Sequence, residues 1–326
     1  MLEHGGNLRD AARHYGREDW LDLSTGINPQ GYPAPPLPPD AWHRLPEPDP
    51  GLAAAACAWY GAPDLLPVAG TQAAIQALPR LRPPSRVTVS APSYAEHAHA
   101  WGKHGHTLRL SSYAALASSI DDSDVVVVVN PNNPTGETVA PKLLLDWADR
   151  LAARGGWLVV DEAFGDTAPG LSVAAHVKRP GLIVLRSVGK FFGLAGLRLG
   201  FVAAQASTLQ ALAELLGPWT VSGPAQGVAR AALSDSAWQG ATQARLARDG
   251  LRMRTLLGEH GIEAAGTPLF HWWAHGEPEA FHDHLARHGI WCRLFREAAR
   301  GIRLGLPPDE AGWRRLETAL HTWSNR

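Results

Sequence analysis

Lysine is rare in this chain, and its four residues stand at positions 103, 142, 178 and 190. A neutral lysine amine can attack a carbonyl group and form a Schiff base, provided that burial or a cationic neighbour favours the uncharged amine. Lys190 differs from the other three in its setting, the segment Ser187-Val-Gly-Lys-Phe-Phe-Gly-Leu-Ala-Gly-Leu-Arg-Leu-Gly200. If the protein uses amine chemistry, we expect it at Lys190.

Four polar motifs each follow a stretch that is expected to form a strand. They are Ala69-Gly-Thr-Gln72, Asn130-Pro-Asn-Asn-Pro-Thr-Gly136, Asp161-Glu-Ala-Phe164 and Ser187-Val-Gly-Lys190. In an open parallel sheet, such positions converge at the carboxyl edge, where ligands bind. Each motif taken alone has an ordinary structural explanation, because turn sequences and solvated loop lysines are common. Their order and spacing in one chain favour a shared functional site.

Other interpretations of the residues around Lys190 are weaker. A phosphate-binding P-loop requires glycine at 184 and serine or threonine at 191, where this chain has Val184 and Phe191. Ser187 and Lys190 match the S-x-x-K of penicillin-binding enzymes, but the chain contains no Lys-Thr-Gly. The segment Gly193-Leu-Ala-Gly196 lacks the spacing of a dinucleotide-binding fingerprint.

The elements that must position these motifs alternate between strand and helix. Apolar stretches of strand length occupy residues 86–90, 125–129, 157–160, 182–185 and 197–203. Helical patterns begin at Thr71, Tyr94 and Ala140. This alternation predicts an α/β fold with a mostly parallel sheet, together with a smaller α+β domain.

We expect three regions along the chain. Residues 1–45 form an N-terminal arm that packs with the small domain and the active site, and its proline-rich stretch 31–40 is a stiff connector. Residues 46–235 form the large ligand-binding domain. Residues 236–326 form the small C-terminal domain, with a helix near 277–288, short strands around Trp291 and Ile302, and a last helix from Asp309.

Composition argues against several classes of partner. A formal net charge of −1 and a pI near 7.0 give no positive field for nucleic acid. No apolar run is long enough to span a membrane, so we expect a cytoplasmic protein. Cys57 and Cys292 form neither a disulfide framework nor a metal motif. His284 and His288 stand four residues apart, and without a third ligand we expect a packing or surface role and no metal.

The motifs resemble the fold-type I pyridoxal-phosphate (PLP) enzymes, in the aminotransferase branch that contains histidinol-phosphate aminotransferases and the threonine-phosphate decarboxylases of cobalamin synthesis. The resemblance covers nearly the whole chain and is strongest in the segment from Ser187 to Gly200. It implies the PLP-dependent aminotransferase-like fold, a homodimer, and PLP held as a Schiff base on Lys190. The large domain would then be the PLP-binding domain.

The resemblance also implies roles for the cofactor-binding residues. Asp161 would face the pyridine nitrogen and keep it protonated, which makes the ring an electron sink. Asn133 would hydrogen-bond the phenolic oxygen, and Tyr94 would stack on the ring. The phosphate would be held by the backbone N–H groups at the start of a helix, by a hydroxyl and by a guanidinium. These phosphate-binding residues are Gly70, Thr71, Gln72, Ser187 and Arg198.

Substrate preference is implied by the arm and the small domain. His4-Gly-Gly-Asn7 and the segment around Asn28 resemble the openings of threonine-phosphate decarboxylases. Arg303 resembles the family arginine that grips the substrate carboxylate, and Arg293 the one that assists the substrate phosphate. His4, Asn7 and Asn28 would complete a pocket for a small phosphorylated amino acid. The implied reaction is decarboxylation of O-phospho-L-threonine to (R)-1-amino-2-propanol phosphate.

Two alternatives stay open at this point. One is a histidinol-phosphate aminotransferase or a related class I/II aminotransferase, and the other is a non-catalytic PLP-binding protein. Two positions also depart from the pattern of the aminotransferase relatives. Phe164 replaces a tyrosine and cannot donate to the phenolic oxygen. Leu45 replaces a tyrosine that reaches the cofactor phosphate of the neighbouring subunit, which puts that contact in doubt.

Overall fold

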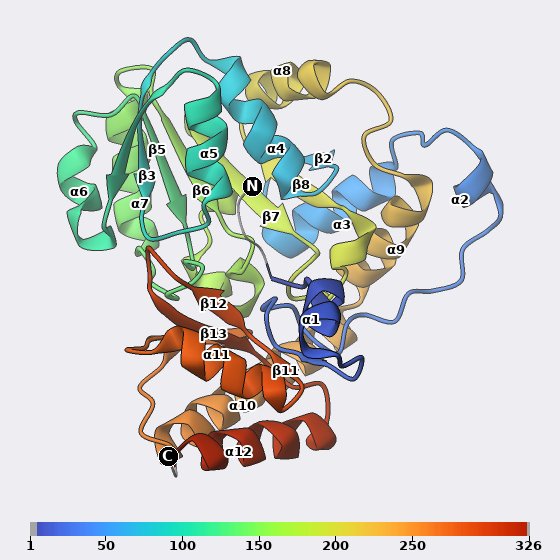
Figure 1. Ribbon diagram of the computed structural model, residues 1–326. Helices are drawn as coiled ribbons and strands as arrows, with labels where there is room; N and C mark the ends of the chain where they lie inside the picture. The colour runs from blue at the N-terminus through green and yellow to red at the C-terminus, as the bar shows by residue number, and fades with distance from the viewer. Residues whose placement is uncertain (1–4, 325–326) are drawn as a thin grey trace. The chain divides into compact units, whose positions relative to one another are not determined.

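The computed structural model describes residues 5–324 (Figure 1). By their mutual contacts the residues fall into two groups, which we describe separately. The large group contains residues 32–133 and 137–240. Of the described residues, the small group contains residues 5–31, the short stretch Pro134–Gly136, and residues 241–324. The expected arm of residues 1–45 therefore divides between the two groups.

A seven-stranded sheet forms the centre of the large group. Five neighbouring strands, β7 to β4 in the sheet order, are parallel, β8 is antiparallel to β7, and β2 is antiparallel to β8. In sheet order the strands are β2 (Leu66–Val68), β8 (Gly200–Ala203), β7 (Leu182–Ser187), β6 (Trp157–Asp161), β5 (Val125–Val129), β3 (Arg86–Ser90) and β4 (Thr107–Ser111).

Strand β5 shows why the sheet lies between helices. Its five residues are all valine and all buried, so apolar side chains point to both faces of the sheet. Val125 and Val127 belong to a core that also contains Ile75 of α4 (Thr71–Ala77) and Trp101 of α5 (Glu96–Lys103). The same core takes in α8 (Ala206–Leu216). Further α-helices of this group are α2 (Asp40–His43), α3 (Pro50–Tyr60), α6 (Leu116–Ser119), α7 (Pro141–Ala152) and α9 (Gly223–Ser234).

The small group contains its own antiparallel sheet of four strands. In sheet order these are β12 (Arg293–Phe295), β13 (Gly301–Gly305), β10 (Phe270–Ala274) and β9 (Ala265–Thr267). A short parallel pair joins β1 (Leu21–Asp22) to β11 (Ile290–Trp291) and so ties the start of the chain to the C-terminal region. The helices are α1 (Leu8–Tyr15), α10 (Ser236–Glu259, which begins in the large group), α11 (Pro278–Arg287) and α12 (Glu310–Ser324).

The fold agrees with the α/β expectation and corrects two boundaries. The last strand of the predicted series begins at Gly200 rather than at residue 197, because Ala195–Leu197 is a 3-10 turn and Arg198 has a left-handed backbone with φ 53°. Helix α5 begins at Glu96 rather than Tyr94. Among the helices of residues 5–324, none is long and apolar enough to cross a membrane.

Candidate active site

The carboxyl ends of β5, β6 and β7 bring three of the predicted motifs to one edge of the sheet. Val129 pairs with Asp161 in the parallel register, so the loop that carries Asn133 starts beside the Asp161 motif. Strand β7 lies on the other side of β6 and ends at Ser187, the first residue of the lysine motif. The sequence prediction that these motifs converge is therefore confirmed for the large group.

Asp161 is a buried carboxylate held by two donors. Its Oδ1 accepts a hydrogen bond of 3.0 Å from the backbone N–H of Ala163. Its Oδ2 lies 2.8 Å from Nε2 of His97, a side chain that is equally buried. An ionised carboxylate only accepts hydrogen bonds, so the imidazole donates here. The sequence prediction missed His97, although its position three residues after Tyr94 at the start of α5 was a usable signal.

The turn from Ser187 to Lys190 is fixed by its own backbone and by aromatic packing. The N–H of Gly189 donates to Oγ of Ser187 over 3.1 Å. The two residues after Lys190 are fully buried phenylalanines, and Phe192 stacks on Trp238 with ring centroids 5.6 Å apart. Nζ of Lys190 lies 5.4 Å from the ring centroid of Phe164. The residue that departs from the family pattern is thus the aromatic neighbour of the amine.

Gly70, Thr71, Ser187 and Arg198 stand where β2 and β7 end and β8 begins. Ser187 pairs with Gly200 across β7 and β8, and Gly200 pairs with Val68 at the end of β2. Gly70 has φ +76°, and a Cβ added to it would lie 2.9 Å from Nη2 of Arg198. A Cβ at Gly200 would likewise lie 2.7 Å from the backbone N of Thr71.

This close approach of glycine backbone to a guanidinium makes a cradle that a side chain would fill. Backbone N–H groups at a helix start, a hydroxyl and an arginine are donors that suit a phosphate group. The residues present therefore fit the phosphate of PLP, and Asp161 and Lys190 would supply a carboxylate and an amine for the rest of the cofactor.

Tyr94 and Gln72 form a bonded pair at the same edge. The Tyr94 hydroxyl donates to Oε1 of Gln72 over 3.3 Å, and Nε2 of Gln72 donates to Glu96 over 2.8 Å. Burial, and then the negative charges of Glu96 and Asp161, raise the pKa of Tyr94 to about 12, while Arg198 opposes them. Tyr94 therefore stays a neutral aromatic ring within electrostatic reach of Asp161 and Arg198.

Asn133 lies half-buried in the loop after β5, and its two neighbours of the same type shape that loop. The side chain of Asn130 bonds the backbone of Val139 in both directions, at 3.2 and 2.9 Å. Nδ2 of Asn132 donates to the carbonyl of Pro92 over 2.8 Å, which ties the loop to the segment that carries Tyr94. These bonds hold the loop that presents Asn133.

A buried ion network that the sequence did not predict involves the residues next to Ser187 and Asp161 in the chain. Arg186, next to Ser187, donates to Glu162 over 2.5 Å and to Asp166 over 2.9 Å. Burial alone lowers the pKa of Arg186, but Asp166 and Glu162 outweigh it and raise the pKa overall. The Arg186 guanidinium also lies 4.5 Å from the ring centroid of Tyr60. The network joins the ends of β6 and β7, which carry Asp161 and Ser187.

Arg293 and Arg303 lie opposite each other in the small group, on β12 and β13. Like charges in directly opposite positions of a sheet repel, so this pairing suits an anion that binds between or near them. Burial, and then the charge of Arg293, lower the pKa of Arg303 to about 9. Nη2 of Arg303 donates to the backbone carbonyl of Ser24 over 2.6 Å.

The expected arm residues lie in the same group as Arg303. The N–H of Gly6 donates to Oγ of Ser24 over 2.7 Å, so part of the His4-Gly-Gly-Asn7 motif contacts the residue that Arg303 binds. Asn7 precedes α1, and its amide contacts Asp10. His4 lies outside the described residues.

Asn28 is buried, and its Oδ1 accepts from Gln30 N at 3.0 Å and from Arg245 Nη2 at 2.9 Å. These contacts show a turn-forming role for its carbonyl oxygen. The sequence prediction did not include Arg245, which stands on a different element and is 217 residues away in the chain.

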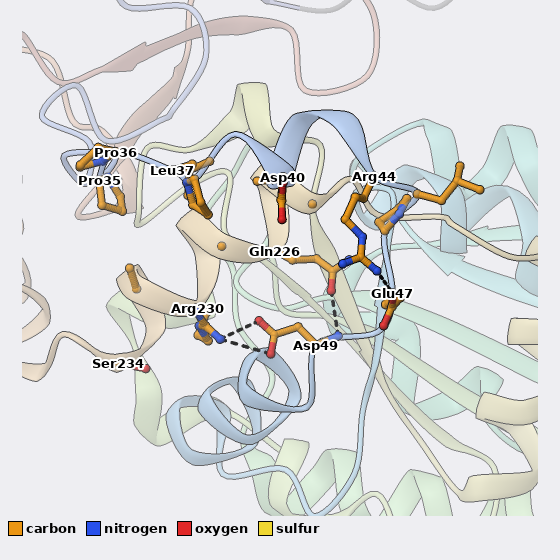
Figure 2. A pocket seen from close by; sticks show the side chains of 17 residues that line it. Pro35, Pro36, Leu37, Asp40, Arg44, Glu47, Asp49, Gln226, Arg230 and Ser234 are labelled. Atoms are coloured by element: carbon orange, nitrogen blue, oxygen red, sulfur yellow. Dashed lines mark hydrogen bonds and ion pairs between the residues drawn. The ribbon is translucent and has the colours of Figure 1, made fainter.

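A separate cavity of about 670 Å³ opens in the large group between the proline-rich segment and α9 (Figure 2). Arg230 and Asp49 form an ion pair of 3.1 Å there, and Gln226 accepts a hydrogen bond of 3.0 Å from the backbone N–H of Asp49. The sequence predicted a stiff connector for the proline-rich segment. In the structure this segment lies beside α9, and both line the cavity. None of the predicted site residues lines this cavity.

Comparison with known proteins places the chain in a family. Residues 20–322 match the model of aminotransferase class I and II. A threonine-phosphate decarboxylase of Pseudomonas aeruginosa is 55% identical over 98% of this chain and 97% of its own length. A threonine-phosphate decarboxylase of a Sinorhizobium species is 45% identical over 98% of this chain and 97% of its own length.

More distant matches share part of the sequence or the fold alone. A histidinol-phosphate aminotransferase of Yersinia pseudotuberculosis is 38% identical over 37% of this chain and 31% of its own length. A crystal structure of histidinol-phosphate aminotransferase from Sinorhizobium meliloti in complex with pyridoxal-5'-phosphate has a TM-score of 0.84 at 21% identity and covers 100% of this chain and 96% of that chain. The protein therefore belongs to the aminotransferase class I and II family, in the group whose nearly full-length relatives are threonine-phosphate decarboxylases.

Proposed function

We propose that this protein binds PLP through Lys190 and decarboxylates O-phospho-L-threonine to (R)-1-amino-2-propanol phosphate. The observation that carries the proposal is the extent of the sequence match. Identity to threonine-phosphate decarboxylases runs over almost the entire chain, whereas the similarity to the histidinol-phosphate aminotransferase of Yersinia covers 37% of it.

The large group supplies the proposed cofactor site. The Lys190 amine would hold PLP covalently, and the Gly70–Gln72 backbone, Ser187 and Arg198 would bind its phosphate. Asp161 would accept a hydrogen bond from the protonated ring nitrogen, Tyr94 would pack on the ring face, and Asn133 would donate to the phenolic oxygen. When bound, PLP supplies an electron sink for the electron pair that a broken bond leaves at the substrate α carbon.

The small group supplies the proposed anion-binding residues for the substrate. Arg303 would bind the carboxylate and Arg293 the phosphate, with Asn7, Asn28 and His4 completing the set. Two cations in opposite register, one of them desolvated, favour a ligand that carries two anionic groups. After carbon dioxide leaves, Lys190 in its protonated form would deliver a proton to the α carbon and become a neutral amine. In a transaminase the proton would go to the cofactor instead, and a keto acid would be released.

A product assay separates the two reactions. The holoprotein is incubated with O-phospho-L-threonine, with carbon dioxide measured in one arm and transamination of 2-oxoglutarate in the other. We expect carbon dioxide and an amino-alcohol phosphate. Transamination without carbon dioxide would support the aminotransferase alternative. Lys190→Ala should lose both turnover and the visible absorbance band of bound PLP, whereas Lys178→Ala should keep both. A band without any turnover in the wild type would support a non-catalytic PLP-binding protein.

A second copy of this chain is the proposed macromolecular partner. Several large apolar side chains of the large group are exposed to solvent, among them Trp42 by 66%, Leu45 by 65% and Trp219 by 60%. Exposed apolar side chains of this size favour burial against a partner. Light scattering after size exclusion should give a dimer mass, and Trp42→Ser with Leu45→Ser should weaken the dimer. We keep the cytoplasm as the proposed location, supported by the absence of a disulfide framework among its two cysteines.

A further inference from the structure

The small group contains a phenylalanine ring that lies near two arginines at once. The guanidinium carbon of Arg293 lies 5.2 Å from the ring centroid of Phe295, and that of Arg303 lies 5.9 Å from the same centroid. Both distances fall within the roughly 6 Å over which the face of an aromatic ring attracts a cation. One ring is therefore within reach of both arginines that are proposed to bind the substrate.

Strand register explains how these three side chains come together. Arg293 and Phe295 stand two residues apart on β12, so their side chains point to the same face of the sheet. Arg303 on β13 pairs directly with Arg293 and shares that face. Phe295 pairs with Gly301, which has no side chain to separate the ring from Arg303. The shared ring thus follows from the pairing of two strands.

The arrangement keeps two like charges close together at a buried position. Arg303 is 5% exposed, and it also lies 5.3 Å from the ring centroid of the fully buried Phe270. Its Nη2 donates to the carbonyl of Ser24 over 2.6 Å. Phe295 adds a ring whose negative face lies near both cations. Attraction to one ring offsets part of the repulsion that would otherwise drive the two guanidinium groups apart.

We propose that Phe295 is a positioning residue that holds the guanidinium groups of Arg293 and Arg303 together, ready for one ligand with two anionic groups. The inference rests on the proposed function in so far as these arginines bind the substrate carboxylate and phosphate. Preorganisation of this kind raises affinity because the ligand does not have to bring the two cations together itself. A ring that merely fills space would not act through its charge distribution.

The test replaces Phe295 in the holoprotein by mono-, di- and trifluorinated phenylalanine, inserted at that position with a suppressor tRNA. Each ring fluorine withdraws negative charge from the ring face and weakens its attraction for a cation, while the size and shape of the side chain change little. Phe295→Leu removes the ring and keeps an apolar side chain.

Three probes without an amine measure binding by calorimetry, since they cannot form a Schiff base with bound PLP. 3-Phosphoglycerate carries a carboxylate and a phosphate ester separated by two carbons, as in phosphothreonine. Glycerol 3-phosphate lacks the carboxylate, and glycerate lacks the phosphate. Carbon dioxide release from phosphothreonine gives kcat and KM for the same proteins.

We expect the dissociation constant of 3-phosphoglycerate to rise with each added fluorine and to be roughly 5- to 30-fold higher in Phe295→Leu. The two probes with one anionic group should change by about 2-fold or less, because neither needs both guanidinium groups at once. KM for phosphothreonine should rise with the same trend, and kcat should change less.

Phe281 is the matched control in the same group. It is fully buried on α11, and its ring packs edge-on against Trp273 with centroids 5.6 Å apart. Among the cation–ring contacts found in residues 5–324, none involves Phe281. The same fluorinated series at Phe281 should leave the affinity for 3-phosphoglycerate unchanged.

Equal affinities for 3-phosphoglycerate along the Phe295 series, or tighter binding with added fluorine, would overturn the inference. So would an equal trend in the Phe281 series. If Phe295→Leu fails to fold, the fluorinated proteins decide. If the wild type binds 3-phosphoglycerate but releases no carbon dioxide from phosphothreonine, the proposed reaction is wrong while the series still decides the role of Phe295. If it binds 3-phosphoglycerate no more tightly than glycerol 3-phosphate, the inference falls.

Discussion

Removing the Arg186 guanidinium should be among the most damaging single changes to stability in the large group. Arg186→Met keeps much of the side-chain length but removes the donors to Glu162 and Asp166, which lie 2.5 and 2.9 Å away. All three side chains are at most 4% exposed, so water cannot replace the lost bonds. Breaking a buried ion pair by removing one partner costs about 3–5 kcal/mol.

The magnitude is large because two carboxylates lose the same cation. Burial already raises the pKa of Asp166, and Arg186 is the first charge that opposes this effect. Without Arg186, Asp166 and Glu162 would both be left as buried carboxylates without the cation that they share. A loss of about 3–5 kcal/mol is a substantial part of the roughly 5–15 kcal/mol that keeps a typical protein folded.

Urea unfolding of the apoprotein, followed by circular dichroism, measures the change. Arg150→Met is the matched control, because Arg150 bonds Asp121 over 2.6 Å while the two side chains are 38% and 69% exposed. An exposed pair contributes about 0–1 kcal/mol. The triple change Arg186→Met, Glu162→Gln and Asp166→Asn should recover part of the loss, since no buried charge is left unpaired. Equal midpoints for Arg186→Met and Arg150→Met would refute the reasoning.

Three further predictions test the phosphate cradle, the substrate arginines and the acid response. Gly70→Ala should weaken PLP binding, because the new Cβ would lie 2.9 Å from the Arg198 guanidinium. Gly61→Ala is the control, since Gly61 also has a positive φ but has open space around it. Equal PLP affinities of the two variants would contradict the proposal that this cradle binds the phosphate. Phosphothreonine at 100 times its dissociation constant should stabilise the wild type by about 2.7 kcal/mol in thermal unfolding, and Arg303→Gln should lose most of this gain. Burial lowers the pKa of His271 from 6.5 to about 4. Between these two pH values His271 binds a proton in the unfolded chain but stays neutral in the folded protein. The free energy of unfolding should therefore fall by about 3 kcal/mol as the pH drops from 6.5 to 4. His271→Leu should show a flatter dependence of the unfolding free energy over this pH range, and an unchanged slope would argue against the assignment.

The sequence was sufficient for the features that local chemistry specifies. The five consecutive valines predicted a strand, because β-branched residues favour extended backbone, and the structure contains it as β5 at residues 125–129 with every residue buried. The order of the motifs after the strands predicted that Asp161, Ser187 and Lys190 share an edge, because the carboxyl ends of parallel strands coincide. Lys190 stood out because its neighbours form a specific segment, whereas the other three lysines have none.

Only the tertiary structure decided which distant side chains complete the site. His97 reaches Asp161 across 64 residues, and Arg186 joins Glu162 and Asp166 through the end of a neighbouring strand. Such contacts depend on helix docking and strand order, which no local pattern encodes. The left-handed backbone of Arg198 likewise follows from the turn that ends at Leu197. The sequence thus determined the fold class and predicted the amine and the carboxylate, while three-dimensional packing decided which groups hold that carboxylate by hydrogen bonds.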